Sequence, residues 1–442
     1  MRSLRVLALC AALATLGCGT NGGSDAGIDA LLPGSDAQDT ETSDLDDAAR
    51  TDDGTGRSCR VSVLGSIAHG PEATRAFELR SLDTRTAHPL AVCNDGSPAI
   101  FVIRPGSGAG RERWLIYLDG GGECHDLDSC NQRSSGANAA IQMSSLGYTP
   151  TWLSAQRWNG VHSTNAAANP LFHDATLVFV PYCSSDVWSG DRGGEGPTAP
   201  GTRRWHFRGR EILRGVIQEL LSVGLSAATE IVLAGTSAGG YGVLNNADDV
   251  GAMLPAGARY VAIADAGFFI DHPAYDGATH APSTATPTLL QQLLTVGAQT
   301  WGGRGDESCE RALGASGPGR CRFGEVMMVG GHVATPVFLQ ESQLDNNQLT
   351  RLGTGRVDDL GRAAVPEEQP YVDGFAAHMR ALLGSVDPWH AVYSGLDSKH
   401  GGLNGADYDR RQIGAVRLAA FMQTWYLDPC RGPRLIELPG SR

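Results

Sequence analysis

The segment 230–241 reads EIVLAGTSAGGY and holds a G-x-S-x-G pattern centred on Ser237. A serine hydroxyl becomes accessible as a nucleophile on a cramped turn between a strand and a helix, where glycines on both sides leave room for the neighbouring backbone. The N–H groups that open the helix, beginning with Ala238, would face the oxyanion formed when the serine attacks a carbonyl group. The chain has 58 glycines, so a plain glycine-rich turn is the alternative. The β-rich run before Ser237 favours the nucleophile.

A second glycine-rich turn, 119–123 (DGGGE), follows the apolar run 114–118. Consecutive glycines after a strand allow backbone N–H groups to turn toward a developing oxyanion. A plain turn is again the alternative, and three glycines in a row make it the weaker one. We expect the N–H groups of Gly121 and Gly122 to complete an oxyanion hole together with that of Ala238.

A serine nucleophile needs a histidine base. In chains with this type of serine turn the order is serine, then acid, then histidine. Three of the twelve histidines follow Asp345. His378 falls in a helical pattern and His390 begins an apolar strand, and both positions are typical of structural histidines. His400 lies in a loop beyond that strand, so it is the predicted base.

The acid is expected at the carboxyl end of a parallel strand, where the chemistry of such sheets gathers. Asp345 follows the strand 337–340 and is the predicted acid, with Glu341 on the same strand end as its nearest rival. Asp265 also ends a strand, but it comes soon after Ser237, and we expect it to support the serine turn. The three side chains would carry out acyl transfer without a metal or an organic cofactor.

The elements that position these residues indicate an α/β fold. Short apolar runs lie at 114–118, 177–180, 231–234, 260–264, 337–340 and 390–393. Helical spacing of apolar residues appears at 205–224 and 408–427. Alternating strands and helices predict a mostly parallel sheet covered on both faces. Residues 59–105 are expected to form flanking hairpins, and 273–330 an insertion over the active-site edge.

The N-terminus predicts export. The apolar run 6–16 is too short to span a bilayer and ends at 16–19 (LGCG), which is typical of a lipoprotein signal with Cys18 as the lipidated residue. Thr15 stands where a leucine is usual, so ordinary secretion remains open. A membrane partner is therefore expected only through a possible lipid anchor.

Charge is concentrated near the N-terminus. Residues 21–57 carry ten acidic residues and two arginines, a local charge of −8 out of a formal −13. Because 19–57 has hardly any large apolar side chain, we expect a disordered acidic linker between a signal peptide, 1–18, and a single domain, 58–442. The domain shows no basic stripe, which argues against nucleic-acid binding. We expect a monomer.

Cysteine usage agrees with export. Eight cysteines remain beyond the signal segment, and an even number in an exported chain favours disulfides. Cys124–Cys130 and Cys309–Cys321 are the predicted local pairs. The other four can pair in three ways, and they are Cys59, Cys93, Cys183 and Cys430. The run 124–130 could also hold a metal, but an oxidising compartment favours a disulfide loop.

Five motifs of the chain match a known family. They are 118–124 (LDGGGEC), 169–190 (NPLFHDATLVFVPYCSSDVWSG), 235–240 (GTSAGG), 264–271 (ADAGFFID) and 338–349 (FLQESQLDNNQL). On these motifs the chain resembles the pectin acetylesterase/Notum carboxylesterases over most of residues 90–430. The resemblance implies an α/β-hydrolase fold, a triad of Ser237, Asp345 and His400, the oxyanion donors proposed above and a structural role for Asp265.

Two departures from the family concern the site. Its plant members have Glu and Trp where this chain has Asp119 and Glu123, so their substrate pocket does not carry over directly. The segment 396–402 around His400 differs from the family's usual cysteine-containing segment. The predicted function is an exported serine carboxylesterase that deacetylates a polysaccharide such as pectin. The alternatives are removal of a longer acyl chain from a protein or lipid, and a non-catalytic surface carbohydrate-binding protein on an esterase scaffold.

Overall fold

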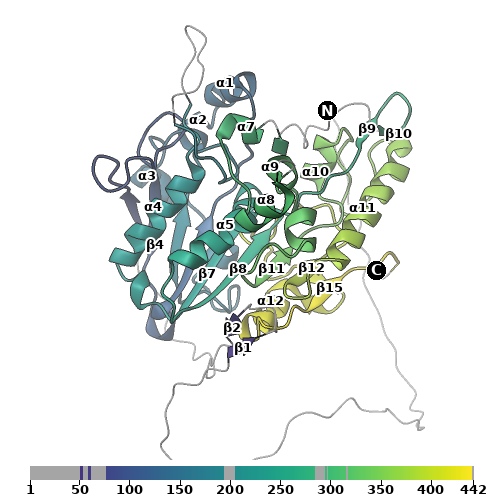
Figure 1. Cartoon of the computed structure of the whole chain (residues 1–442). Helices are drawn as coiled ribbons and strands as arrows, with labels where there is room; N and C mark the ends of the chain where they lie inside the picture. Colours follow the sequence, from purple (N-terminus) through teal and green to yellow (C-terminus); the bar gives the residue numbers. More distant parts are fainter. Residues whose placement is uncertain are drawn as a thin grey trace, which may run out of the picture. The chain divides into compact units, whose positions relative to one another are not determined.

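A mixed β-sheet forms the centre of the computed structural model (Figure 1). The structure describes residues 50–52, 58–60, 76–193, 205–283, 294–295, 297–314 and 317–440. Among these residues, nine strands form the sheet in the order β15-β12-β11-β8-β7-β5-β6-β4-β3. The strands are β3 (Glu78–Ser81), β4 (Ile100–Arg104), β5 (Arg113–Leu118), β6 (Thr176–Val180), β7 (Glu230–Thr236), β8 (Arg259–Asp265), β11 (Val337–Gln340), β12 (Ala391–Ser394) and β15 (Arg434–Ile436).

The strand directions follow the predicted pattern. All neighbours from β15 to β6 pair in parallel, and β4 and β3 add an antiparallel edge beside β6. Strands β5, β6, β11 and β12 are buried along their whole length, as expected for strands that are covered on both faces. The six apolar runs of the sequence correspond to β5, β6, β7, β8, β11 and β12. The predicted α/β-hydrolase-like, mostly parallel sheet is confirmed.

Helices cover both faces of the sheet. They are α1 (Leu127–Ser135), α2 (Ala139–Gln142), α3 (Pro150–Ala155), α4 (Gly209–Ser222), α5 (Ala238–Met253), α7 (Gly297–Trp301), α8 (Glu307–Leu313), α9 (Gly317–Arg320), α10 (Asn346–Arg351), α11 (Gln369–Gly384) and α12 (Leu418–Leu427). Short helical turns are η1 (Gly108–Glu112), η2 (Gly160–His162), η3 (Leu225–Ala227), η6 (Glu325–Val329) and η7 (Pro366–Glu368).

Two hydrophobic cores correspond to the two faces. Helices α4, α5 and α11 pack on one face, which they share with alternate strand residues such as Ile116 and Leu233 (Figure 1). Helix α12 packs on the other face against the intervening residues, among them Phe338. Each fully buried aliphatic or aromatic side chain contributes about 1.5–3 kcal/mol. The alternation along each strand therefore holds the sheet in register between its two helical layers.

The helix predicted at 408–427 is wrong in its first half. Only α12 is helical, and the residues before it form a hairpin of β13 (Gln412–Ile413) and β14 (Val416–Arg417). Gly414 at the turn has a φ of +55°, a backbone conformation that interrupts a helix. Ile413 is still buried in the same core as α12, so its apolar character suggested a helix that the chain does not form.

One predicted helix begins later than expected, and a short hairpin lies near the predicted linker. Helix α4 begins at Gly209, later than the predicted 205. Residues 50–52, within the predicted disordered linker, form β1 (Arg50–Asp52) and pair with β2 (Ser58–Arg60). The linker was predicted because 19–57 has hardly any large apolar side chain, and backbone pairing of this kind does not need such side chains. Residues 1–49, including Cys18, lie outside the described part of the chain. Within the described part, no helix is both long and apolar enough to cross a membrane.

The insertion 273–330 packs at the carboxyl edge of the sheet. It contains the hairpin β9 (Ala274–Asp276) and β10 (Ala281–Ser283), followed by α7, α8, α9 and η6. Trp301 of α7 donates its indole N–H to the carbonyl oxygen of Cys124 at 2.7 Å, just after β5. Figure 1 shows α7 beside α1 at this edge. The position agrees with the predicted insertion over the site.

The disulfides resolve most of the cysteine pairing. Both predicted local pairs, Cys124–Cys130 and Cys309–Cys321, are confirmed. Cys93 pairs with Cys183, which is one of the connectivities that the sequence left open. Cys430 is also disulfide-bonded, and the side chain of Cys59 lies outside the described part. The described side chains contain no group of three or more His, Cys, Asp or Glu that could hold a metal ion.

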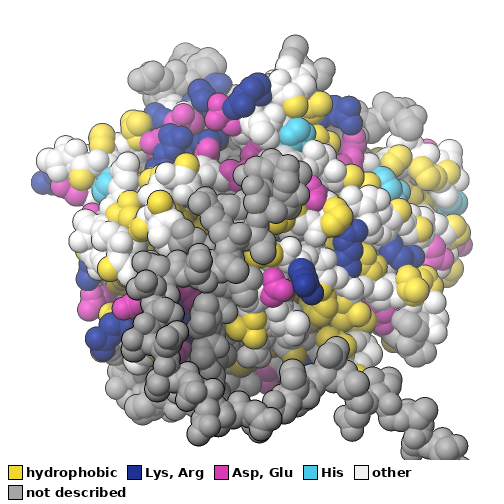
Figure 2. All heavy atoms as spheres, turned by 60° about the horizontal axis from the view of Figure 1, so that its bottom comes forward, with side chains coloured by type: hydrophobic (Ala, Val, Ile, Leu, Met, Phe, Trp, Pro, Cys, Tyr) yellow, Lys and Arg dark blue, Asp and Glu magenta, His cyan; other side chains and the backbone are white. Residues whose placement is uncertain are grey.

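The surface mixes charges of both signs. On the face drawn in Figure 2, Lys and Arg side chains lie interspersed with Asp and Glu side chains over the described atoms. Such a pattern differs from the continuous basic stripe that phosphate backbones require. The expectation against nucleic-acid binding stays a prediction.

Candidate active site

Ser237 stands on the predicted turn between β7 and α5. Its backbone has φ 60° and ψ −121°, a strained conformation for a residue with a side chain. A Cβ on Gly239 would overlap the carbonyl oxygen of Leu118, so the glycine two residues after the serine is required by the close approach of β5. The serine side chain is thereby held at the carboxyl edge of the sheet.

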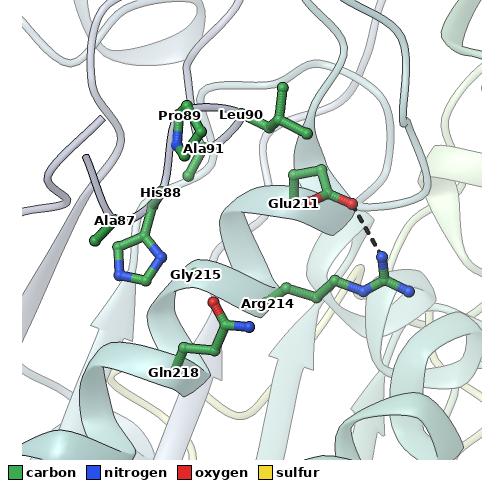
Figure 3. Close-up of a pocket in the computed structure, with 9 residues that line it drawn as sticks. All are labelled: Ala87, His88, Pro89, Leu90, Ala91, Glu211, Arg214, Gly215 and Gln218. Carbon is green, nitrogen blue, oxygen red and sulfur yellow. Dashed lines mark hydrogen bonds and ion pairs between the residues drawn. The ribbon is translucent and has the colours of Figure 1, made fainter. Parts of the chain in front are cut away.

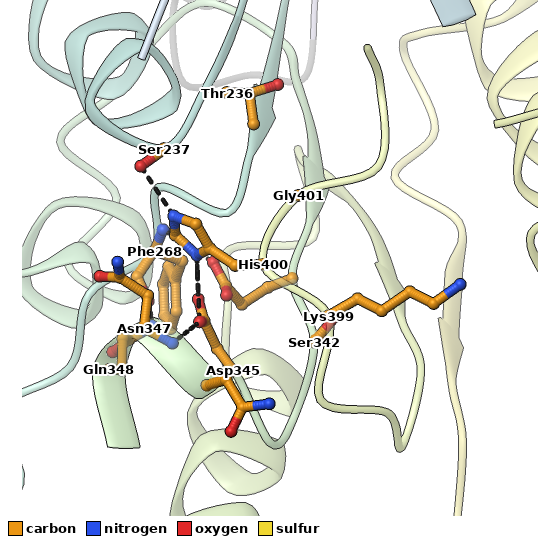
Figure 4. A network of polar contacts seen from close by, with 12 residues as sticks. Thr236, Ser237, Phe268, Ser342, Asp345, Asn347, Gln348, Lys399, His400 and Gly401 are labelled. Carbon is orange, nitrogen blue, oxygen red and sulfur yellow. Dashed lines mark hydrogen bonds and ion pairs between the residues drawn. The ribbon is translucent and has the colours of Figure 1, made fainter. Parts of the chain in front are cut away.

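Ser237, His400 and Asp345 form a continuous hydrogen-bonded chain (Figure 4). His400 Nε2 lies 2.7 Å from Ser237 Oγ, and its Nδ1 lies 2.8 Å and 3.0 Å from the two carboxylate oxygens of Asp345. With Nδ1–H donating to Asp345, Nε2 is free to accept the hydroxyl proton of the serine. The three side chains come from loops after β7, β12 and β11. The arrangement can deprotonate a serine and stabilise the imidazolium that results.

Asp345 is held in place by the helix that it caps. It is the N-cap of α10 and accepts the backbone N–H of Asn347 at 2.7 Å, while its side chain is completely buried. Burial raises the pKa of the Asp345 carboxyl, but the charge of His400 and the hydrogen bonds from His400 and Asn347 outweigh burial and leave the pKa below its usual range. Asp345 is therefore ionised and oriented toward the imidazole.

Glu341, the rival acid, lies beside Asp345. Its Oε2 accepts the backbone N–H of Phe268 at 3.0 Å, and no hydrogen bond joins it to His400 among the described contacts. Burial and the neighbouring charge of Asp345 raise the pKa of Glu341 well above its usual range. The neutral form of the Glu341 carboxyl is therefore favoured beside Asp345.

Asp265 ties the serine turn to the histidine loop. Its Oδ2 accepts hydrogen bonds from the Thr236 hydroxyl at 2.7 Å and from the backbone N–H groups of Gly402 and Leu403 at 2.8 Å and 3.0 Å. Its carbonyl oxygen accepts the N–H of Ser237 at 2.8 Å. Burial raises the pKa of Asp265, and these hydrogen bonds partly offset that effect. Its position agrees with the supporting role expected from the sequence.

The glycine loop that holds two of the expected oxyanion donors passes close to the serine, since a Cβ on Gly120 would lie 3.1 Å from the Cβ of Ser237. Gly121 and Gly122 have φ of 140° and 73°, which glycine adopts without strain. Their N–H groups, and that of Ala238, donate to no backbone carbonyl among the described residues. Arg133 of α1 donates to the Gly121 carbonyl oxygen at 2.7 Å and to Ser185 Oγ at 2.9 Å, and so ties the glycine loop to α1 and to the segment after β6. No pattern in the sequence pointed to Arg133.

The other two late histidines lie elsewhere. His390 Nδ1 accepts the N–H of Val337 at 3.2 Å, at the amino end of β11 and so at the opposite edge of the sheet from Ser237. His378 lies on α11 with its Nδ1 2.9 Å from that of His272. Neither imidazole contacts Ser237, in agreement with the structural roles expected for both.

A surface hollow of about 240 Å³ lies between the loop 87–91 and α4 (Figure 3). Its lining includes Glu211 and Arg214, which pair at 3.0 Å. The lining contains no residue of the hydrogen-bonded chain and none of the glycines of 119–123. The hollow is therefore separate from the site around Ser237.

Comparisons with known proteins agree with this geometry. A family model described as pectinacetylesterase matches residues 74–394, which include Ser237 and Asp345 and end before His400. The palmitoleoyl-protein carboxylesterase NOTUM of Drosophila melanogaster is 30% identical over 369 residues, covering 82% of this chain and 50% of the relative. The human protein of the same name is 32% identical over 303 residues, covering 66% of this chain and 56% of the relative. The chain thus spans about half the length of these curated relatives.

A solved structure of the Wnt deacylase Notum from Drosophila is similar to the fold described here. The TM-score is 0.68 at 27% sequence identity, and the match covers 82% of this chain and 97% of the solved chain. Most of the described sheet, its serine turn and the strand end that carries Asp345 fall within the region matched by the family model. On this sequence match and this fold, the chain belongs to the pectinacetylesterase family, a family of carboxylesterases.

Proposed function

We propose that the protein is a serine carboxylesterase with Ser237 as its nucleophile. The observation that carries the proposal is the hydrogen-bonded chain from Ser237 through His400 to the buried Asp345. Ser237 attacks the ester carbonyl while His400 takes its proton, and Asp345 holds the imidazole in the required tautomer. His400 then protonates the departing alcohol. Water repeats the sequence on the acyl-serine and releases the acid.

The proposed oxyanion hole consists of three backbone N–H groups. Those of Gly121 and Gly122 follow β5, and that of Ala238 opens α5, whose dipole adds a favourable partial charge. Donors of this kind stabilise the tetrahedral intermediate because they are oriented before charge develops. The contact from Arg133 to the Gly121 carbonyl supports this orientation.

The proposed substrate is an acetylated polysaccharide such as pectin. The family description supports it, and so does the charged pair of Glu123 and Arg351 beside the oxyanion loop. The second candidate is a longer acyl ester on a protein or lipid, which the names of the Notum relatives favour. A third candidate, a non-catalytic carbohydrate-binding protein, would leave Ser237 unreactive.

The test combines a covalent probe with two substrates. A fluorophosphonate probe should label the wild-type protein and leave Ser237→Ala unlabelled. The wild type should hydrolyse p-nitrophenyl acetate and release acetate from acetylated pectin or xylan. Absence of both labelling and hydrolysis would support the non-catalytic alternative. Hydrolysis of small esters without acetate release would reject the polysaccharide substrate and leave the esterase.

The pH dependence of activity should reflect His400. Burial lowers the pKa of His400, but the charge of Asp345 and its hydrogen bond outweigh burial and raise the pKa above its ordinary 6.5. A general base must be neutral to accept a proton. The value of kcat/KM should therefore reach its plateau above the raised pKa of His400 and fall as the pH drops through that pKa. The measurement is a pH profile of kcat/KM for p-nitrophenyl acetate. An acid limb centred below 6.5 would contradict this assignment.

We also propose that the protein is exported and anchored through Cys18. Wild-type protein should then partition with membranes, and Cys18→Ser should release it or block its processing. Cell fractionation followed by immunoblotting measures this. Wild-type protein found wholly soluble outside the cell would indicate ordinary secretion, and the esterase proposal would be unaffected.

A further inference from the structure

Glu123 and Arg351 form a bidentate ion pair next to the proposed oxyanion hole. Arg351 Nη1 lies 2.6 Å from Glu123 Oε1, and Nη2 lies 3.2 Å from Oε2. The side chain of Glu123 is 9% exposed and that of Arg351 is 19% exposed, so water screens the pair only weakly. Charge-assisted bonds in this geometry fix both side chains in one arrangement.

The sheet order shows what the pair spans. Glu123 lies in the loop after β5, and Arg351 ends α10, which follows β11. Strands β7 and β8 lie between β5 and β11, and β7 leads into Ser237. The pair therefore bridges the carboxyl ends of the strands on both sides of the serine.

Local contacts place the guanidinium of Arg351 against the site. Its Nη2 lies 4.0 Å from the position that a Cβ on Gly122 would occupy. Its Nε donates to Asn347 Oδ1 at 2.9 Å, and the N–H of Asn347 donates to Asp345. The positive charge of Arg351 also acts on the pKa of His400 in the lowering direction. The ion pair thus lies between the oxyanion loop and the proposed acid.

We propose that the Glu123–Arg351 ion pair is a specificity determinant that restricts the acyl group of the substrate to short chains. The inference rests on the proposed esterase function. Arg351 Nη2 lies 4.0 Å from the position of a Cβ on Gly122, a proposed oxyanion donor, so the substituents of a carbonyl carbon bound there would lie near the pair. In this proposal the acyl substituent lies on this side. A long alkyl chain there would remove water from two charges without replacing their hydrogen bonds. An acetyl group is too short to incur this cost.

A purely structural role for the pair makes a different prediction. If the pair only anchored the oxyanion loop to α10, its loss would slow all esters by a similar factor. A specificity role changes the ratio between long and short acyl groups. This ratio is insensitive to the fraction of correctly folded enzyme, because both substrates are measured on the same sample.

The experiment measures kcat/KM for p-nitrophenyl acetate, butyrate and octanoate. The wild type should favour acetate over octanoate by at least ~10-fold, and Glu123→Leu combined with Arg351→Leu should raise the octanoate-to-acetate ratio by at least ~10-fold. Both residues are changed together because a single change would leave one partly buried charge unpaired. If the double leucine variant does not fold, Glu123→Gln with Arg351→Gln should shift the ratio in the same direction.

Arg210→Leu with Asp249→Leu is the matched control. The side chains of Arg210 and Asp249 are also partly buried, at 8% and 32% exposed, but Asp249 lies about 17 Å along α5 from Ala238 by the helical rise. The octanoate-to-acetate ratio of this control variant should equal that of the wild type. An unchanged ratio in the Glu123/Arg351 variants, or a change seen only when the alcohol is varied in a series of alkyl acetates, would overturn the inference and leave the esterase. A wild type inactive on every ester would instead overturn the proposed function.

Discussion

Replacing Ser237 by alanine is expected to lower kcat by at least ~10³-fold, because the variant has no nucleophile to form the acyl intermediate. The hydroxyl lies 2.7 Å from His400 Nε2 and has little other role in the fold, so stability should change little. The measurement is kcat for p-nitrophenyl acetate at saturating substrate, with thermal unfolding as the control.

The double variant tests whether His400 acts with Ser237. Residues of a catalytic chain act as a unit, so adding His400→Ala to Ser237→Ala should cost little more than Ser237→Ala alone. His390→Ala, at the opposite edge of the sheet, is the histidine control. If the loss of kcat in the double variant equalled the product of the losses in Ser237→Ala and His400→Ala, His400 would not be the partner of Ser237.

Asp345→Asn is expected to lower kcat by about 10⁴-fold with the fold intact. The asparagine side chain can still accept the N–H of Asn347 and cap α10. Its amide cannot hold Nδ1–H of His400 as a carboxylate does, so the imidazole favours the wrong tautomer. The charge that raises the pKa of His400 is lost as well, so the acid limb of any residual activity should move to lower pH.

Glu341→Gln is the matched comparison for the acid. Burial and the charge of Asp345 raise the pKa of Glu341 and favour its neutral form, which glutamine resembles, and the amide oxygen can still accept the N–H of Phe268. We therefore expect a loss in kcat of less than ~10-fold, since no charge is removed. Both variants should be measured at saturating substrate after their thermal stabilities are matched. A severe loss in Glu341→Gln with a mild one in Asp345→Asn would reverse the assignment of the acid.

Much of the fold could be read from local patterns. The six apolar runs became six parallel or central strands because a strand covered on both faces must be apolar throughout, and that requirement is visible in a few consecutive residues. Helix α4 was visible for the same kind of reason, since its buried face repeats at helical spacing. The helix predicted over 408–417 was wrong, because burial in a common core requires apolar residues but does not fix the conformation of the backbone. Gly414 determined the backbone there.

The proposed site divides in the same way. Ser237 and the glycines of 119–123 are recognisable from sequence because the chemistry of a turn depends on adjacent residues. His400 and Asp345 could be selected by their order in the chain and their places after strands. Their hydrogen bonds, at 2.7 Å and 2.8 Å, arise only because the sheet brings the ends of β7, β11 and β12 to one edge.

Contacts between residues far apart in the chain were decided only by the tertiary structure. The pairing of Cys93 with Cys183, the raised pKa of Glu341 beside Asp345 and the ion pair of Glu123 with Arg351 all depend on which loops meet. Composition and spacing identify the type of each residue but not its distant neighbour. The charge state of a buried carboxyl is set by that neighbour and by the loss of water, so it follows from the fold rather than from the residue.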